Sequence, residues 1–131
     1  MAFRLKGDPS EHDIQSAILR ALRIHPAVAH FWRQNTGAMA IGEGKARRFV
    51  RFGPKGQPDI QGYLKNGTAL FIEVKSRTGK VTPEQKEFLE RAQKHGAVAF
   101  VARDVATVFE VLDGVLRGQT AQKQIPASSA R

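Results

Sequence analysis

The sequence predicts one mixed α/β domain with a central mixed β-sheet flanked by helices. Three observations support this fold class. Segments with helical spacing of apolar residues alternate with short apolar runs, an Asn66-Gly67 pair marks a tight turn between two of those runs, and capping residues precede the helical segments. The expected order is α-β-(hairpin)-β-β-α-β-α over residues 1–117, and residues 118–131 are expected to form a disordered polar tail.

The first helix is expected over residues 8–24. Asp8 or Ser10 can cap its start, and Pro9 suits its first turn. Its apolar residues recur at the spacing of one helical face, at Ile14, Ala17, Ile18, Ala21 and Leu22.

A strand is expected next, over residues 28–34, with Phe31 and Trp32 in the core or at an interface rather than stacking on bases. Residues 37–56 are rich in glycine and in basic side chains. Within them, residues 47–52 alternate basic and apolar, which predicts one arm of a hairpin. The rest of that segment is expected to be a mobile loop.

Two further strands are expected over residues 58–63 and 69–75, joined by a two-residue turn at Asn66-Gly67. The second is almost continuously apolar, which is typical of a strand buried on both faces.

The last third of the chain predicts a helix, a strand and a helix. Thr82 and Gln85 form a capping-box pattern at the start of the first helix, and Gly96 ends it. A strand over residues 97–102 follows, and Asp104 caps the final helix.

The composition limits the function classes. The chain has 131 residues, about one domain's worth, with 21 Lys and Arg against 12 Asp and Glu and a net charge of +9. Such a surplus favours a polyanionic partner, with nucleic acid first and an anionic membrane second. The absence of cysteine excludes a disulfide scaffold, a cysteine nucleophile and a Cys-based zinc site. With no membrane-length apolar stretch and no signal-peptide pattern, a cytoplasmic location is expected.

Three charged residues are expected to meet at one point of the sheet. Asp59 lies near the start of one strand and Glu73 near the end of its hairpin neighbour. Counting from the turn places their carboxylates almost opposite each other, where cross-strand side chains are about 5 Å apart. Lys75 follows Glu73 by two residues and so points to the same face.

Two carboxylates and an ammonium suit phosphodiester hydrolysis. Oxygen ligands suit Mg²⁺, which polarises a phosphate and lowers the pKa of a bound water, while a lysine can orient that water or stabilise developing charge. The alternative is a surface hairpin with ordinary charges. The proline before Asp59, the apolar run into Glu73 and the capped helix after Lys75 favour an active site.

A basic loop forms a second candidate site. Five positive charges fall within 11 residues, at Lys45, Arg47, Arg48, Arg51 and Lys55. Contacts with a DNA backbone need this kind of charge. The alternative is a solvated loop with no binding role.

The pair Pro58-Asp59 followed by Glu73-Val74-Lys75 resembles the PD-(D/E)XK nuclease signature. Further motifs resemble one branch of that superfamily, the virus-type replication-repair nuclease (VRR-NUC) domain. These motifs are Glu11-x3-Gln15, Asn35-x-Gly37, Gly53-x2-Gly56-x-Pro58-Asp59, Gly79-x5-Gln85 and Val101-Ala102-Arg103. The resemblance spans about residues 10–112, and stand-alone, phage-linked members of the family are similar in size to this chain.

The resemblance implies a restriction-endonuclease-like core and DNA cleavage that depends on Mg²⁺ or Mn²⁺. It implies that Glu11 completes the acidic set with Asp59 and Glu73, that the Val74 carbonyl assists metal binding, and that Gln85 supports Lys75. Glu11 could instead complement the helix dipole from an exposed first turn. For Gln85, the capping box is an alternative that can coexist with the family role.

These observations predict a metal-dependent DNA endonuclease acting on structured or branched DNA, such as a four-way junction or a flap. A non-catalytic basic DNA-binding module that retains a nuclease fold is the first alternative, and an RNA- or membrane-binding basic protein is the second. A homodimer is expected, because two matched cuts need two sites. Phe31, Trp32, Phe49 and Phe52 could form its interface or could lie in the core of the protomer.

Overall fold

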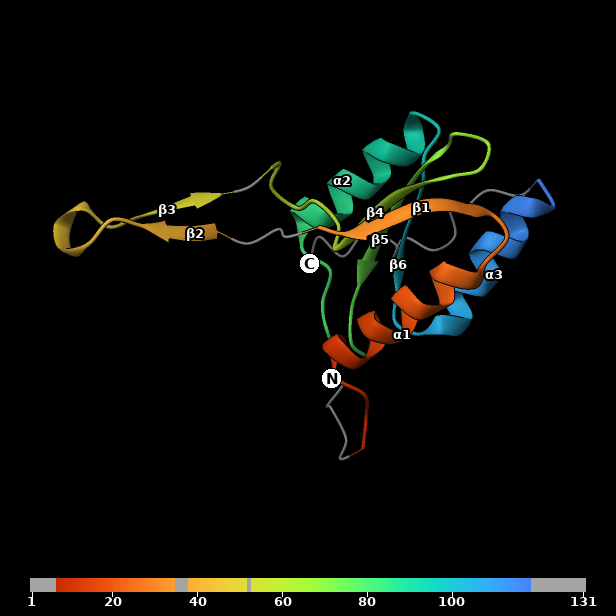
Figure 1. Cartoon of the computed structure of the whole chain (residues 1–131), viewed down its shortest axis with the longest axis horizontal. Coiled ribbons are helices and arrows are strands. Elements are labelled where there is room, and N and C mark those ends of the chain that lie inside the picture. The colour runs from red at the N-terminus through yellow and green to blue at the C-terminus, as the bar shows by residue number, and fades with distance from the viewer. Residues whose placement is uncertain (1–6, 35–37, 52, 119–131) are drawn as a thin grey trace.

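The computed structural model describes residues 7–34, 38–51 and 53–118. Figure 1 shows a sheet with helices packed against it and a long hairpin that extends away from it. The elements in chain order are α1 (Glu11–Ile24), β1 (Val28–Arg33), β2 (Ala38–Ile41), the 3-10 helix η1 (Gly44–Ala46), β3 (Arg48–Arg51), β4 (Ile60–Leu64), β5 (Ala69–Val74), α2 (Pro83–Lys94), β6 (Val98–Ala102) and α3 (Val105–Leu116).

The main sheet has four strands in the order β1-β4-β5-β6. The pairs β1-β4 and β4-β5 are antiparallel, whereas β5-β6 is parallel, so the sheet is mixed. The helix α2 supplies the crossover that a parallel pair requires. The predicted fold class is confirmed, and the arrangement is consistent with a restriction-endonuclease-like core.

The two faces of the sheet carry different helices. Apolar residues of α1 and α3 form the main core with one face of the sheet, and its fully buried members include Ile18, Ile60, Ile72, Phe100 and Leu112. On the other face, Leu89 of α2 packs against Ala99 and Val101 of β6. Strand β6 is therefore buried on both sides, as its continuous apolar sequence requires.

The capping predictions are confirmed for α2 and α3 and are corrected in part for α1. Thr82 accepts a hydrogen bond from the backbone N–H of Gln85, and Asp104 accepts one from Thr107. At α1 the cap is Ser10, which forms a capping box with Asp13. Pro9 therefore precedes the cap instead of lying in the first turn.

The hairpin between β4 and β5 has a longer turn than the sequence predicts. Leu64 pairs with Thr68 through its backbone N–H, which leaves a three-residue connection that ends in Gly67 at φ 88°. The strand register pairs Ile60 with Ile72. One step further along the same register, Asp59 stands directly opposite Glu73, closer than a two-residue turn would bring them.

The hairpin of residues 38–51, which we call the basic arm, is a correction to the predicted mobile loop. Strands β2 and β3 pair antiparallel, from Ala38 opposite Arg51 to Ile41 opposite Arg48. The alternation of residues 47–52 predicts β3 correctly. The sequence Ala-Met-Ala-Ile of β2 lacks polar alternation, and its strand form follows from pairing with β3. Of the residues used in the predictions, Asn35, Gly37, Phe52 and the tail from 119 onward lie outside the described residues.

Within the described part of the chain, none of the helices is long and apolar enough to cross a bilayer.

Candidate functional site

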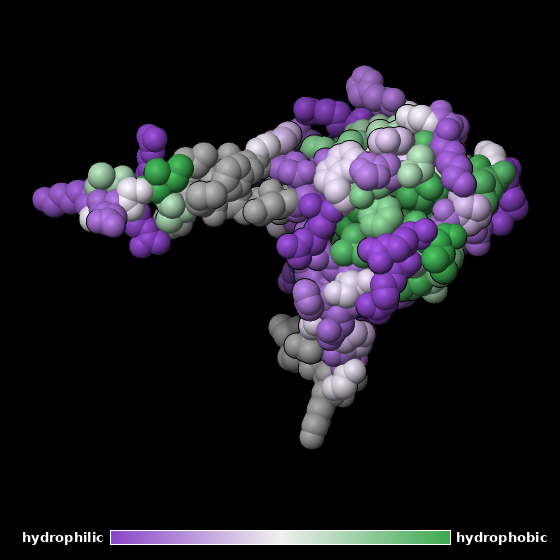
Figure 2. All heavy atoms as spheres, viewed as in Figure 1, coloured by the Kyte–Doolittle hydropathy of each residue, from purple (hydrophilic) through white to green (hydrophobic). Residues whose placement is uncertain are grey.

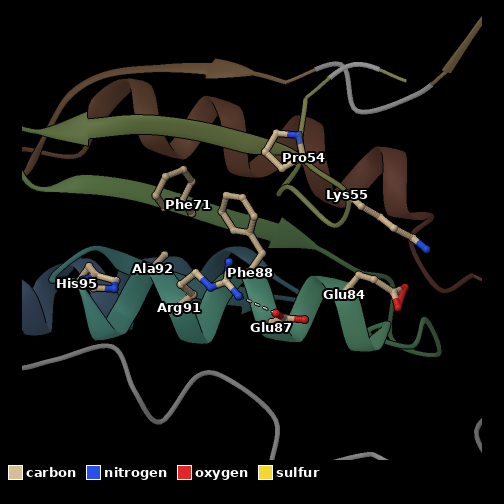
Figure 3. Close-up of a pocket in the computed structure, with 9 residues that line it drawn as sticks. All are labelled: Pro54, Lys55, Phe71, Glu84, Glu87, Phe88, Arg91, Ala92 and His95. Carbon is tan, nitrogen blue, oxygen red and sulfur yellow. Dashed lines mark hydrogen bonds and ion pairs between the residues drawn. The ribbon is translucent and has the colours of Figure 1, made fainter. Parts of the chain in front are cut away.

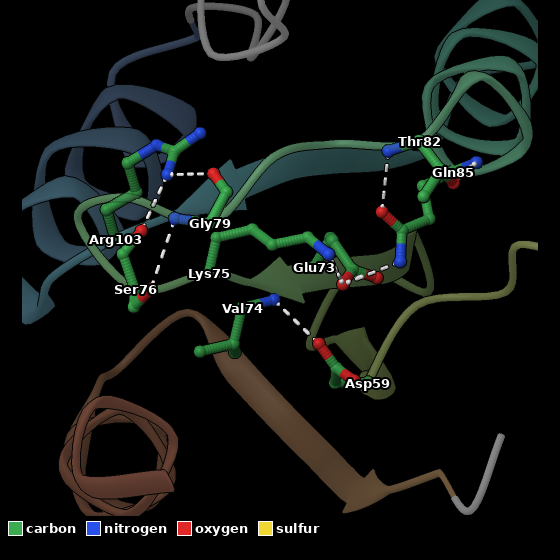
Figure 4. A network of polar contacts seen from close by, with 9 residues as sticks. All are labelled: Asp59, Glu73, Val74, Lys75, Ser76, Gly79, Thr82, Gln85 and Arg103. Atoms are coloured by element: carbon green, nitrogen blue, oxygen red, sulfur yellow. Dashed lines mark hydrogen bonds and ion pairs between the residues drawn. The ribbon is translucent and has the colours of Figure 1, made fainter. Parts of the chain in front are cut away.

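The two predicted carboxylates lie side by side at one edge of the strands β4 and β5. Asp59 precedes β4, and its Oδ2 atom accepts a hydrogen bond of 2.8 Å from the backbone N–H of Val74. Glu73 is on β5 and its side chain is only 3% exposed. The bond to Val74 fixes the Asp59 carboxylate against the strand that carries Glu73 (Figure 4).

The Glu73 carboxylate has one satisfied and one unsatisfied oxygen. Its Oε2 atom accepts a hydrogen bond from Gln85 Nε2 at 3.2 Å and lies 3.5 Å from Lys75 Nζ. Its Oε1 atom is buried and has no hydrogen-bond partner among the residues that the structure describes. A buried acceptor without a partner costs free energy, about 1–3 kcal/mol or more for a charged group. The site therefore has an unfilled place for a positively charged or donating group.

The pKa of Glu73 reflects the lack of sufficient positive charge beside the Asp59 and Glu73 carboxyl groups. Burial first, and then the charge of Asp59, raise the pKa of Glu73 to about 9. Lys75 lowers the pKa of Glu73, but by less than the other effects raise it. Two adjacent carboxylates in a buried place cannot both be ionised cheaply without an added cation.

Gln85 combines its two suggested roles. Its Oε1 accepts a hydrogen bond of 2.9 Å from the N–H of Thr82, which completes the capping box, while its Nε2 donates to Glu73. The helix start therefore fixes which end of the amide faces the carboxylate.

The loop before Asp59 reaches the helix start through a glycine. Gly56 has φ 80°, and a Cβ atom on it would lie 2.5 Å from the backbone carbonyl of Glu84. Only glycine permits this approach. The glycine spacing before Pro58-Asp59 thus has a physical role, because it holds the Asp59 segment against the start of α2.

Arg103 fixes the loop that follows Lys75, and sequence reasoning gave this arginine no role. Its Nη1 donates to the carbonyls of Ser76 and Gly79, at 2.6 and 2.7 Å. Lys75 itself continues the parallel ladder, since its N–H donates to Ala102. The available signal was the position of Arg103 directly after the buried strand β6, beside the end of β5.

Glu11 lies exposed in the first turn of α1. The segment before this helix is tied to the loop after Lys75 by an ion pair of 2.9 Å between Asp8 and Arg77. Among the described residues no three His, Asp or Glu side chains gather as a metal-binding group, so Glu11 does not join Asp59 and Glu73 in one. The role of Glu11 as a ligand stays a prediction.

The predicted DNA-binding residues lie on or just after the basic arm. Lys45, Arg47 and Arg48 are exposed on it, and Lys55 is exposed in the loop that leads back to the sheet. The backbone of Arg51 ends β3, and its side chain is outside the described set. Figure 2 shows that hydrophilic residues gather at the outer end of the arm.

A pocket of about 470 Å³ lies beside α2, and the sequence analysis did not predict it. Phe71 of β5 and Phe88 of α2 line it in an edge-to-face contact with ring centroids 5.2 Å apart. Lys55 and Glu84 line the same pocket, near the start of α2 (Figure 3).

The carboxylate site, by which we mean Asp59, Glu73, Lys75 and Gln85, fits a divalent cation in its donor chemistry. It offers carboxylate oxygens, and the Oε1 atom of Glu73, which has no partner among the described residues, is one of them. Mg²⁺ commonly binds through one or two carboxylates and completes its shell with water and substrate phosphate. Two protein carboxylates are therefore sufficient.

The comparisons with known proteins agree with this chemistry. A family model described as "VRR-NUC domain" matches residues 10–106, about three quarters of the chain. No curated protein and no solved structure matches. The matched region includes α1, the whole main sheet, α2 and the carboxylate site. The chain therefore belongs to the VRR-NUC family of nuclease domains.

Proposed function

We propose that this protein is a Mg²⁺- or Mn²⁺-dependent DNA endonuclease that hydrolyses phosphodiester bonds in structured or branched DNA. The observation that carries the proposal is the buried Glu73 carboxylate opposite Asp59, with an oxygen that lacks a partner among the described residues. A carboxyl group that is buried with one oxygen unsatisfied is expensive for folding alone, and a catalytic role explains why it is there.

Each residue of the site has a distinct role in this mechanism. Asp59 and Glu73 would hold the metal ion, with the Val74 carbonyl as a further ligand. Glu11 is exposed and does not gather with them in this structure, and it would be a ligand only after moving to the ion. When bound, the ion would polarise the phosphate and lower the pKa of a water. The Lys75 ammonium orients the attacking water or stabilises charge on the phosphate oxygens. Gln85 keeps the Glu73 carboxylate oriented through its hydrogen bond to Oε2.

Substrate binding depends on the basic arm and the loop after it. Lys45, Arg47, Arg48, Arg51 and Lys55 would contact DNA phosphates without reading sequence. We further propose a single domain over residues 1–117, a cytoplasmic place of action in a bacterial or phage-infected cell, and a homodimer.

The homodimer follows from the substrate. One domain offers one carboxylate site, whereas a four-way junction has approximate two-fold symmetry and needs two matched cuts. An arm that crosses to the partner would line a shared channel. Light scattering tests this, because a dimer has twice the 14.5 kDa mass of the chain. A monomer that still makes paired cuts would refute it.

The activity itself is tested with labelled four-way junctions, flaps, nicked duplexes and linear duplexes in Mg²⁺, Mn²⁺ or EDTA. Glu73→Gln is compared with Glu110→Gln, the same change at an exposed residue of α3. We expect the wild type and Glu110→Gln to cut branched DNA with either metal, and Glu73→Gln to bind DNA without cutting. Binding without cleavage by the wild type under every condition would favour a non-catalytic module.

A further inference from the structure

Three aromatic side chains lie close together on the half of the sheet formed by β1 and β4. The His30 ring is 5.7 Å from the Trp32 ring and 5.8 Å from the Tyr63 ring, measured between centroids. Trp32 is 41% exposed and Tyr63 is 45% exposed. Of the two places expected for Trp32, the core is therefore wrong, and we call these three residues the aromatic platform.

The aromatic platform is on the same face of the sheet as the carboxylate site. In the strand register Trp32 stands opposite Gln61, and Gln61 stands opposite Phe71. Phe71 and Glu73 are two residues apart on β5 and so share a face. The neighbouring Phe31 packs with the core on the opposite face, as alternation along β1 requires.

A chain of hydrogen bonds connects the platform to Asp59. The N–H of Gln34 donates to the Asp59 carbonyl at 2.7 Å. The side-chain oxygen of Gln34 in turn accepts a bond of 3.2 Å from Trp32 Nε1. Sheet spacings place the Trp32 and Asp59 backbones about 8 Å apart. The indole is thus held at a fixed position within a short reach of the carboxylates.

Half-exposed rings beside a phosphodiester-cleaving site suit nucleobases. Aromatic side chains on a sheet face bind unpaired bases by stacking, without reading sequence, and a positively charged protein attracts the backbone of the same strand. The chain's net charge of +9 provides that attraction. A second copy of the chain seated on the platform would cover the approach to Asp59 and Glu73, so this face suits the substrate better than a partner subunit.

We propose that His30, Trp32 and Tyr63 form a stacking platform for unpaired bases of the DNA strand that passes the carboxylate site. This inference rests on the proposed nuclease function and deepens it. It implies that a substrate with a single-stranded part next to the cut, such as a flap or a splayed end, uses the platform, and that fully paired DNA leaves the platform unused.

Trp32 provides a direct measurement, because it is the single tryptophan of the chain. Its fluorescence is followed while the metal-free protein is titrated with a short oligothymidylate or with a blunt-ended linear duplex. Anisotropy of the labelled DNA reports binding in parallel. We expect the oligothymidylate to quench Trp32 strongly and the duplex to leave its emission nearly unchanged. Equal quenching by both, or no quenching at saturation, would overturn the proposal.

Variants separate stacking from general binding. Tyr63→Ala should weaken oligothymidylate binding about tenfold, within the range for one stacked base, and leave duplex binding unchanged. Tyr63→Phe keeps the ring and should bind as the wild type does. Leu116→Ala, which changes an exposed apolar side chain at the end of α3, is the matched control and should change neither. If Tyr63→Ala weakens both DNAs equally, the surface binds backbone only and the proposal fails.

Two further outcomes are distinguishable. If Trp32 emission shifts on dilution without DNA while light scattering shows a dimer dissociating, the surface belongs to a second copy and the platform is refuted. The titration contains no metal, so it measures base stacking independently of cleavage. If oligothymidylate quenches Trp32 but the protein cuts no DNA, the nuclease function alone is refuted. Cleavage of flaps without any quenching would refute the platform alone.

Discussion

The carboxylate site and the basic arm hold their charges in opposite ways. In the carboxylate site, Glu73 and Lys75 have side chains only 3% and 12% exposed, and neighbouring backbone and side-chain groups fix their positions. On the arm, Lys45, Arg47 and Arg48 are exposed on a two-stranded hairpin. The difference shows that this domain separates chemistry, which needs fixed geometry, from backbone binding, which needs mainly charge.

The strongest test of the carboxylate site is Lys75→Ala. Its control is Lys80→Ala, which removes the same charge from an exposed lysine nearby. We expect Lys75→Ala to lower kcat by about a hundredfold to a thousandfold, the usual cost of losing one electrostatic stabiliser. Mn²⁺ affinity, measured by calorimetric titration, should change little, because an ammonium is not a ligand. Loss of metal binding would instead give Lys75 a structural role.

The basic arm is tested by neutralising Arg47, Arg48 and Arg51 together. Affinity should fall for all DNA sequences alike, and the slope of log K against log salt should fall by about one unit for each phosphate group that the variant no longer binds. The free energy of unfolding should change by no more than about 0.5 kcal/mol for each of the exposed residues Arg47 and Arg48. An unchanged salt slope would show that the arm is only solvated.

The dependence of the carboxylate site on backbone packing is tested with a pair of glycines. Gly56 and Gly67 both have positive φ, 80° and 88°, but only a Cβ on Gly56 would meet the backbone of Glu84. Gly67→Ala should cost about 1–2 kcal/mol of stability and leave kcat unchanged. Gly56→Ala should cost more and also lower kcat, because Asp59 and Gln85 shift relative to each other. Equal effects of the two variants on kcat would refute the positioning role.

The burial of Glu73 in the carboxylate site predicts that the stability of the metal-free protein depends on pH. The pKa of Glu73 is raised to about 9 in the folded state, so the folded protein holds a proton that the unfolded chain releases near its ordinary value of 4.5. The stability from this proton is complete below that ordinary value and is lost as the pH rises toward the folded pKa, at a slope of at most about 1.4 kcal/mol per pH unit.

Glu73→Gln replaces the protonated carboxyl with a neutral amide and should remove this slope. Denaturant unfolding in EDTA between about pH 5 and pH 8 should show the variant gaining stability relative to the wild type as the pH rises. Glu110→Gln should follow the wild-type curve. Parallel curves for Glu73→Gln and the wild type would mean that Glu73 is ionised in the folded protein.

Local patterns predicted the parts of this fold that local contacts determine. The caps at Thr82 and Asp104 and the Asp59-Glu73 pairing follow from residues within one hairpin or one helix turn. The turn length was missed by one residue, because Asn-Gly also fits a three-residue connection with Gly67 at positive φ.

The features that the sequence did not predict depend on partners far away along the chain. His25 looks like an ordinary helix-end or surface histidine, yet it is 5% exposed and bonded to Asp113 in α3. Arg103 reaches carbonyls more than twenty residues earlier. Helix α2 packs mainly against β6 and β5, at the opposite edge of the sheet from β1, and Trp32 on β1 is exposed. Such contacts are set by how the layers pack, which spacing in one segment does not encode.

Gln85 makes two side-chain hydrogen bonds at once, to Thr82 and to Glu73. Together these bonds distinguish glutamine from glutamate, although a capping box normally accepts either residue. A glutamate at this position could accept the Thr82 N–H equally well and complete the same cap. It could not donate to Glu73, and it would bring another negative charge beside a carboxyl group whose pKa burial and Asp59 already raise. The start of α2 therefore favours glutamine over glutamate because of Glu73 on β5. One amide group both caps the helix and holds a carboxyl group of the candidate site.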